Sequence, residues 1–265
     1  MESADELVKS GEWRRRLDAG ARWIGHGLLD LLYPPVCLNC DAPVATPDTL
    51  CPQCFVQLRP ITAPLCPRLG LPFEVSLGAD AVSAEAIADP PPFGRARAAV
   101  IYGPVASTIV SRLKYGDRPE LARFCARLMA SAGHELWTQT PLLVPVPLHP
   151  ARQRARRYNQ SAELAVLLGQ LTGLGVDAGL VQRIRKTRQQ VGLSGDGRLR
   201  NVAGAFAVAP DRLMHVAGKR VVLVDDVYTT GATTKAVTRA LFKAGAESID
   251  VVTFARVVIG ADLPI

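Results

Sequence analysis

The stretch VVLVDDVYTTGATTKA, residues 221–236, sets two adjacent carboxylates between an apolar run and a small hydroxylated loop. The run VVLV (221–224) is continuously apolar, which predicts a strand buried on both faces. The loop after it is almost all threonine and glycine, and residues 233–244 then follow helical periodicity. The stretch therefore predicts a strand, a loop and a helix, with Asp225 and Asp226 at the carboxyl end of the strand.

Strands and helices alternate through the rest of the second half of the chain. Apolar, β-branched runs predict strands, and segments with a helically spaced apolar face predict helices. The expected strands lie at 97–102, 142–148 and 249–258, and the expected helices at 104–115, 119–132 and 159–169. This alternation predicts an α/β fold, a parallel sheet with helices on both faces.

In an open parallel sheet, ligands bind at the carboxyl ends of the strands, where the aspartates are expected. The loop leads into a helix N-terminus, whose free N–H groups and dipole favour an anion. Gly231 lets the backbone approach a ligand closely, and four hydroxyls lie around it: Thr229, Thr230, Thr233 and Thr234. Because carboxylates repel phosphate, they must face another group. A ribose with two adjacent hydroxyls beside its own 5′-phosphate satisfies both halves of the motif.

Three other phosphate or acidic motifs do not fit. A P-loop needs GxxxxGK[ST], but Gly218-Lys219 is followed by Arg220. A dinucleotide fingerprint needs GxGxxG, and GLGVDAG (173–179) has the wrong spacing. A receiver domain needs more chain after its paired acids than the 39 residues that follow Asp226. A purely structural role, as an acidic turn and a capped helix, stays the alternative.

Four of the six cysteines lie within eighteen residues, as CLNC, ten residues and CPQC. Two CxxC pairs can present four thiolates to one tetrahedral zinc. The alternative is a pair of disulfides, but no export signal precedes the segment, and thiols stay reduced inside cells. The pattern predicts a structural zinc site at Cys37, Cys40, Cys51 and Cys54. Cys125 falls on the apolar face of a predicted helix, and Cys66 has no cysteine three residues on, so it reads as a lone thiol.

Three regions follow from these patterns. Residues 1–33 hold an amphipathic helix, for which packing against protein is favoured over membrane binding. Residues 34–94 hold the cysteine module and a linker rich in proline and alanine, and residues 95–265 hold the α/β domain. No apolar run approaches the roughly 20 residues that a membrane span needs, and the N-terminus is no secretory signal. We therefore expect a cytoplasmic protein without a membrane span.

The net charge of +7 and the pI near 9.3 favour an anionic partner. Basic runs at 14–16, 152–157 and 183–188 are candidates for phosphate contacts. Aromatic residues make up only 6% of the chain, which argues against extensive base stacking.

VVLVDDVYTTGATTKA resembles the phosphoribosyl pyrophosphate (PRPP) signature of type I phosphoribosyltransferases. From about residue 28 to 257 the chain resembles the ComF family, competence-associated proteins that join a zinc-ribbon region to such a domain. The further landmarks are YPPVCLNC, CPQC, PPPFGRARAAVIYG, LKYGDRPELA, VPVPLHPARQRARRYNQSAELA and RKTRQQVGLSGDGRLRNVAGAF. Family members often carry a second set of cysteines beginning at the position of Cys66, but Leu69 and residues 81–93 lack the remaining thiols.

The resemblance implies a role for each part of the motif. Asp225 and Asp226 would accept hydrogen bonds from the ribose hydroxyls. Thr229, Thr230, Gly231, Ala232 and Thr233 would hold the 5′-phosphate, and Tyr228 belongs to the same PRPP-binding set. A pyrophosphate neutralised by Mg²⁺ would also need cations, and the segment after the strand at 142–148 supplies them. The candidates there are Arg152, Arg154, Arg156 and Arg157, of which Arg152 and Arg156 are the main ones, with Lys114 and Arg188 as weaker candidates.

Two functions of different classes remain open. The first is a PRPP-binding accessory protein of DNA uptake and natural transformation, which handles incoming single-stranded DNA beside the competence machinery. The second is an active phosphoribosyltransferase, which transfers the ribosyl group from PRPP to an acceptor that no residue pattern names.

Overall fold

A computed structural model describes residues 34–76, 78, 81–115, 118–148, 159–185 and 204–258. The chain divides into two compact units, Met1–Cys51 and Pro52–Ile265. The described part of the first unit is a turn-rich segment in which Val36 and Pro43 form an antiparallel bridge. None of the helices among these residues has the length and apolarity to cross a membrane.

The second unit is built on a sheet of four parallel strands. Its spatial order is β1 (Ala96–Ile101), β6 (Ser248–Arg256), β5 (Arg220–Tyr228) and β2 (Leu142–Pro145). The register pairs Val222 of β5 with Asp250 of β6, and Leu143 of β2 with Val222. All four strands fall on the predicted apolar runs, and the parallel α/β architecture is confirmed.

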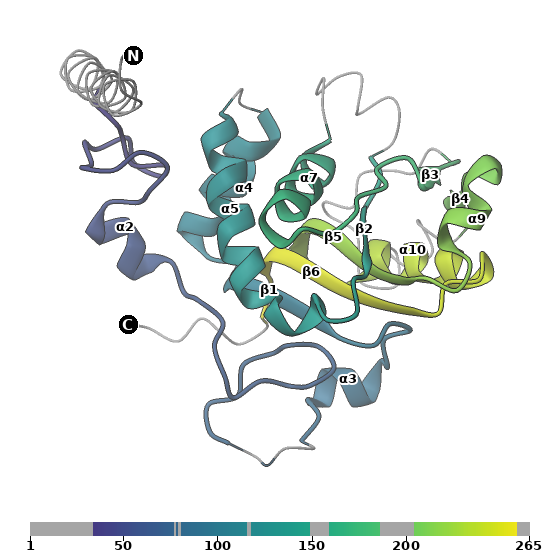
Figure 1. Cartoon of the computed structure of the whole chain (residues 1–265). Helices are drawn as coiled ribbons and strands as arrows, with labels where there is room; N and C mark the ends of the chain where they lie inside the picture. The colour runs from purple at the N-terminus through teal and green to yellow at the C-terminus, as the bar shows by residue number, and fades with distance from the viewer. Residues whose placement is uncertain are drawn as a thin grey trace, which may run out of the picture. The chain divides into compact units, whose positions relative to one another are not determined.

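Helices cover both faces of this sheet (Figure 1). On one face, α4 (Pro104–Tyr115), α5 (Pro119–Ala132) and α7 (Gln160–Thr172) pack beside one another. On the other, α10 (Ala232–Lys243) buries Val237 and Leu241 in one cluster with Val221 and Leu223 of β5. Alternate residues of a strand point to opposite faces, so this cluster fixes which side α10 covers.

Several short elements have no counterpart among the predicted ones. They are α2 (Pro52–Gln57), α3 (Ala84–Ala88), η1 (His134–Leu136), η2 (Pro210–Arg212), α9 (Leu213–Val216) and an antiparallel pair of β3 (Val181–Arg183) with β4 (Phe206–Val208). Each is too short to show a hydrophobic period of its own.

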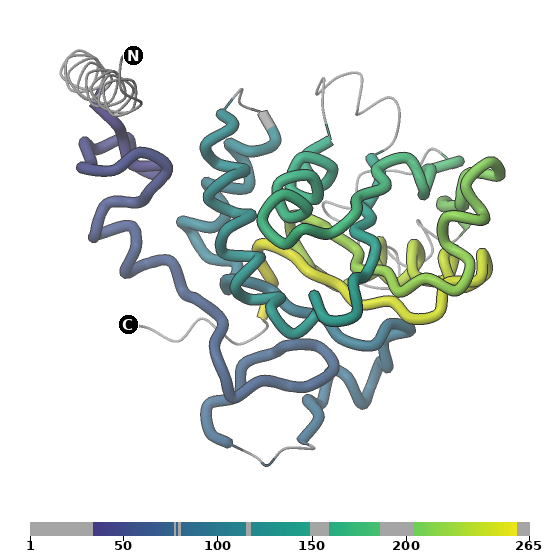
Figure 2. The backbone as a smooth tube through the Cα atoms, viewed as in Figure 1, coloured from purple at the N-terminus to yellow at the C-terminus, as the bar shows by residue number. Residues whose placement is uncertain are grey.

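Parts of the segment that the sequence assigns to the cysteine module and linker are bonded to the sheet; Figure 2 shows the path of the backbone. The Ile61 N–H donates to the Ala99 carbonyl at 2.9 Å, and the Ala96 N–H donates to the Arg68 carbonyl at 2.8 Å. The Gly94 N–H donates to the Ile249 carbonyl at 2.8 Å. These bonds tie the segment to β1 and to the start of β6.

Candidate functional site

The paired aspartates lie within strand β5, where it still pairs with β6, rather than after the end of the strand. Asp225 lies opposite Thr253 of β6, and the pairing continues to Tyr228 opposite Arg256. The sequence predicts a strand that ends at 224, because the apolar run ends there. The backbone of β6 stays within reach for four more residues and keeps the ladder intact.

Asp225 is held by two donors. Its Oδ1 accepts from the Ser161 hydroxyl at 2.9 Å and from the Asp226 N–H at 3.0 Å. Burial, together with the neighbouring charge of Asp226, raises the pKa of Asp225 to about 7. A buried carboxyl whose pKa is raised to near neutrality is typical of a functional site more than of a structural turn.

Asp226 faces a cation instead. The Lys114 ammonium, in the last turn of α4, lies 3.2 Å from its Oδ2. The carboxylate pair therefore lies between the C-terminal end of α4 and the N-terminal end of α7. One acid carries an ion pair, and the other accepts from a hydroxyl.

The start of α7 explains why these groups meet. Asn159 caps the helix by accepting from the Ser161 N–H at 3.1 Å, and its Nδ2 donates to the Val146 carbonyl at 3.3 Å. The cap fixes Ser161 against Asp225. Gln160 donates from its side chain to the Lys114 carbonyl at 3.4 Å, which ties the end of α4 to the same place. Our sequence reasoning missed Ser161 as a site residue, although the capping signal Asn-Gln-Ser-Ala-Glu was available.

The loop between β5 and α10 has the shape expected of an anion cradle. Gly231 stands at the start of α10 with a left-handed φ of +69°. A Cβ added there would lie 2.1 Å from the Tyr228 hydroxyl, so only glycine fits. The Thr230 hydroxyl is buried and makes no hydrogen bond within the described structure. A buried hydroxyl without a protein partner beside a helix N-terminus is available to donate to a bound anion or to a water.

Tyr228 supports this loop from within the core. Its ring is 2% exposed and meets Phe93 edge-on, with 6.2 Å between ring centroids. The Arg256 guanidinium lies 4.4 Å from the ring centroid, a cation–π geometry. Burial raises the pKa of Tyr228 to about 12, so the phenol stays protonated. This packing holds the Tyr228 side chain in place against Gly231.

The structure places the aspartates on β5 and the predicted loop residues directly after it, at the start of α10. Arg152, Arg156 and Arg188 lie outside the described residues, as does the basic run at 14–16. Lys114, which the sequence ranks lower, is the cation that the described structure places beside the aspartates.

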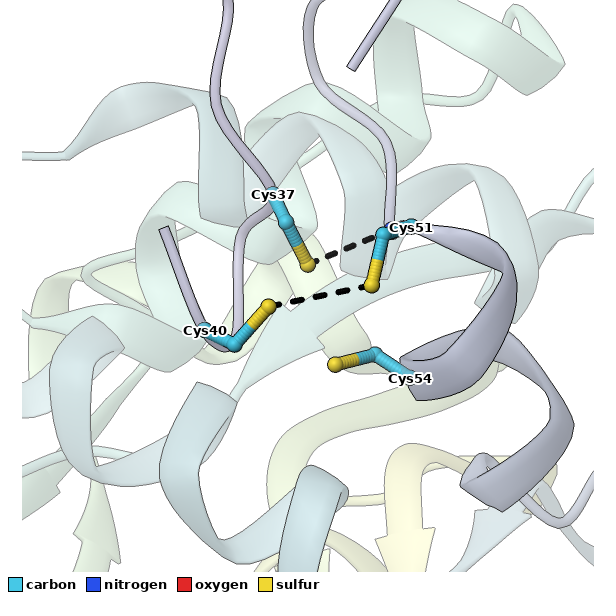
Figure 3. Close-up of side chains that lie close together, drawn as sticks. All are labelled: Cys37, Cys40, Cys51 and Cys54. Carbon is cyan, nitrogen blue, oxygen red and sulfur yellow. Dashed lines mark hydrogen bonds between the residues drawn. The ribbon is translucent and has the colours of Figure 1, made fainter. Parts of the chain in front are cut away.

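The four predicted zinc ligands converge in a separate centre (Figure 3). The sulfur atoms of Cys37, Cys40, Cys51 and Cys54 all lie within 4.8 Å of one another, and 3.7 Å separates Cys40 from Cys51. Zn–S bonds of about 2.3 Å in a tetrahedron put sulfurs about 3.8 Å apart, so the spacing fits zinc. None of the six cysteines forms a disulfide.

The local backbone prepares Cys37 for a metal. Its sulfur accepts from the Cys51 N–H at 3.2 Å and from the Asn39 N–H at 3.5 Å. Burial acts to raise its pKa, but these N–H groups and that of Cys40 outweigh it and lower the pKa to about 6. The thiolate is the form that binds zinc, so these N–H groups favour the form of Cys37 that can bind the metal.

Comparison with known families matches both halves of the chain. The double zinc ribbon domain family matches residues 28–86. The phosphoribosyl transferase domain family matches residues 114–263, more than half of the chain.

Several curated proteins are similar over most of their length. DNA utilization protein YhgH of Salmonella typhimurium is 32% identical over 227 residues, which cover 83% of this chain and 96% of that protein. The Escherichia coli K12 protein of the same name is 30% identical over 237 residues, covering 88% and 95%. Competence protein F of Haemophilus influenzae is 34% identical over 156 residues, covering 57% and 67%. With a four-cysteine ribbon ahead of a phosphoribosyltransferase-like sheet, the chain belongs to the ComF family of competence and DNA utilization proteins.

Proposed function

We propose that this protein binds PRPP with Mg²⁺ at the end of β5 and serves as an accessory factor in the use of incoming DNA. The observation that carries the proposal is the pairing of two acids with an anion cradle in one strand–loop–helix unit. Asp225 and Asp226 precede a loop whose Gly231 admits no side chain and whose Thr230 hydroxyl is buried without a partner. A lone phosphate would not account for the acids, and a bare sugar would not account for the cradle.

Each part of PRPP has a matching group. The two carboxylates accept from the ribose hydroxyls, and the loop from Thr229 to Thr233 donates to the 5′-phosphate from backbone and hydroxyl groups. Arg152 and Arg156 are assigned to the pyrophosphate, and the Lys114 ammonium lies 3.2 Å from the Asp226 carboxylate. Mg²⁺ would neutralise charge on the pyrophosphate.

The biological role rests on the relatives and on charge. Relatives similar over most of the chain are named for DNA utilization, and others for competence. The net charge of +7 favours an anionic polymer such as single-stranded DNA. With few aromatic residues, the contacts would be mainly to phosphate, without sequence preference. A cytoplasmic location, where PRPP and imported single strands meet, belongs to the same proposal.

A thermal unfolding series tests the PRPP part. A ligand present at 100 times its Kd stabilises the folded state by about 2.7 kcal/mol. We expect PRPP with Mg²⁺ to raise the melting temperature, and ribose 5-phosphate or pyrophosphate alone, each carrying half of the groups, to raise it less. No shift with saturating PRPP would refute the assignment.

Fluorescence anisotropy with a labelled single-stranded oligonucleotide tests the DNA part. Affinity should fall steeply as salt rises, because bound phosphates release counterions. Equal affinity for several unrelated sequences is also expected. An absence of binding at low salt would remove DNA as a direct partner.

Turnover of PRPP is the second candidate, and the pKa of Asp225 near 7 is the observation that favours it. A group that titrates there can exchange a proton with an acceptor near neutral pH. Transfer would form a bond from the acceptor to C1 of the ribose as the bond to pyrophosphate breaks. Pyrophosphate release that depends on an added amine or nucleobase would establish it. Release at the rate of the uncatalysed reaction would leave binding as the function.

A further inference from the structure

The two halves of the N-terminal cysteine region are structural repeats of each other, 29 residues apart. Val36 bridges Pro43 in the first, and Leu65 bridges Pro72 in the second. The Val44 N–H donates to the Pro35 carbonyl at 2.9 Å, and the Phe73 N–H donates to the Pro64 carbonyl at the same distance.

The turn inside each bridge is also the same. The Cys37 N–H donates to the Ala42 carbonyl at 2.7 Å, and the Cys66 N–H donates to Leu71 at 2.8 Å. The residue just before the accepting carbonyl has a left-handed φ of +61° in both turns; it is Asp41 in the first and Gly70 in the second. Cys66 thus occupies the position of Cys37, and Leu69 occupies the position of Cys40.

The second arm of the ribbon repeats as well, with three residues more in the spacer. The Cys51 N–H donates to the Cys37 sulfur at 3.2 Å, and the Ser83 N–H donates to the Cys66 sulfur at 3.4 Å. A helix follows each time, α2 from Pro52 and α3 from Ala84. Ser83 therefore stands for Cys51, and by the same offset Ala86 stands for Cys54.

We propose that residues 64–89 are a second zinc ribbon that has lost its metal, with Cys66, Leu69, Ser83 and Ala86 in the four ligand positions. This set offers one sulfur and one hydroxyl, and it is not a set that zinc uses in structural sites. Within the described residues, the four cysteines at 37–54 are the one cluster able to hold a metal ion. The residues therefore fit one zinc and do not fit the second that a double ribbon implies.

Packing and hydrogen bonds take the place of the metal. Cys66, Leu69 and Ala86 are buried within the core that also holds Phe93 and Ala96. The Ser83 hydroxyl donates to the Cys66 sulfur at 3.3 Å and accepts from the Ala86 N–H at 3.4 Å, so it connects the turn at Cys66 to α3. An apolar cluster fused to the main core needs no ion to stay ordered, whereas an isolated ribbon does.

Zinc counting on the full-length chain tests this proposal. Elemental analysis should give one zinc per native chain. In Cys37→Ser/Cys40→Ser the count should fall from one to zero, because Cys66 holds no metal by itself. Two ions in the native chain, or one retained in this variant, would overturn the proposal.

Restoring the ligands provides the positive test. Leu69→Cys/Ser83→Cys/Ala86→Cys should raise the count to two and double the sulfur-to-metal charge-transfer absorption when cobalt replaces zinc. The matched control Leu69→Ala/Ser83→Ala, which disturbs the same positions without adding thiols, should stay at one. A folded triple-cysteine chain that still binds one ion would contradict the position-for-position assignment.

A single substitution decides the matter even if the triple variant does not fold. Cys66→Ala should leave the zinc count at one while lowering the melting temperature, because the Ser83 hydroxyl loses its acceptor in the core. A fall in zinc content would mean that Cys66 is a ligand, and the proposal would fail.

Discussion

Gly231 decides the shape of the loop between β5 and α10. Alanine there must adopt a φ of +69° and place its Cβ 2.1 Å from the Tyr228 hydroxyl. The left-handed conformation alone costs about 1–2 kcal/mol for a residue other than glycine, and the clash adds to it because Tyr228 is packed rigidly. Gly231→Ala should therefore destabilise the protein by more than that amount in denaturant unfolding.

Gly218→Ala is the matched control for this prediction. Gly218 has nearly the same φ, +65°, but nothing lies within 4 Å of its added Cβ. Gly218→Ala should lower the free energy of unfolding only by the cost of the left-handed backbone conformation. Equal losses for the two variants would show that Tyr228 does not confine the loop.

The charge state of Asp225 should govern how stability depends on pH. Because its pKa is raised to about 7, stability linked to its protonated form is complete below pH 4 and is lost as pH rises through 7. The charge of Asp226 raises the pKa of Asp225, whereas the Ser161 hydroxyl, which donates to the carboxyl, and the charge of Lys114 lower it. Between pH 4 and pH 8 the melting temperature of the native chain should therefore fall relative to that of Asp225→Asn, which has no carboxyl to ionise at this position. Parallel pH curves for the two proteins would refute the raised pKa.

At this scale the sequence predicted that the acids and the glycine loop follow one apolar strand, but not which side chains contact the acids. Asp225, Asp226 and Gly231 follow one another along the chain, so a strand pattern and a glycine were enough to find them. Ser161 and Lys114 are 64 and 112 residues from the acids they meet. Only the packing of α4 and α7 on one face of the sheet reveals those contacts.

Strand β6 braces the site through Arg256. This side chain is 1% exposed, and its guanidinium donates to the Leu69 carbonyl at 3.0 Å and to Glu85 of α3 at 2.9 Å. It also covers the ring of Tyr228, which lies beneath Gly231. The Arg256 side chain therefore connects the segment 64–89 to the tyrosine that packs against Gly231.

Replacing Arg256 should be costly. Arg256→Met keeps the length of the side chain but leaves a buried carbonyl without its donor and removes the cation–π contact. Together these should lower the free energy of unfolding by about 3 kcal/mol. Arg220→Met, in the exposed pair with Glu247, is the control and should cost about 0–1 kcal/mol. Similar losses in denaturant unfolding would show that Arg256 does not brace the site.

Elements with a strong period were predictable, and those fixed by tertiary contacts were not. Strands β1 and β6 and helices α4 and α5 fall within one or two residues of their predicted bounds. The continuation of β5 through Tyr228 depends on pairing with β6, which no local pattern contains. The family resemblance placed a second, incomplete cysteine set at Cys66, but the positions equivalent to Cys51 and Cys54 could not be found, because only Pro-x-Cys and a later proline recur between 35–43 and 64–72.

The whole chain should respond to zinc removal in one region. The ribbon from Cys37 to Cys54 has few buried residues besides its cysteines, so the metal must supply most of its order. A strong chelator should increase hydrogen exchange in residues 34–58, while β5 and β6 keep their protection. Mass spectrometry of peptides from both regions measures this. Equal loss of protection in the sheet, or no change in the ribbon, would contradict a local structural zinc.

The central claim is that the paired aspartates bind the ribose of PRPP. Calorimetric titration with PRPP and Mg²⁺ should compare the native chain with Asp225→Ala/Asp226→Ala. The control is Asp211→Ala/Glu247→Ala, which removes two exposed acids. We predict that native and control proteins bind alike and that the aspartate variant loses binding. If the two acids merely lay near a phosphate, their removal would relieve repulsion, so unchanged or tighter binding by that variant would contradict the claim, as would no binding by the native chain.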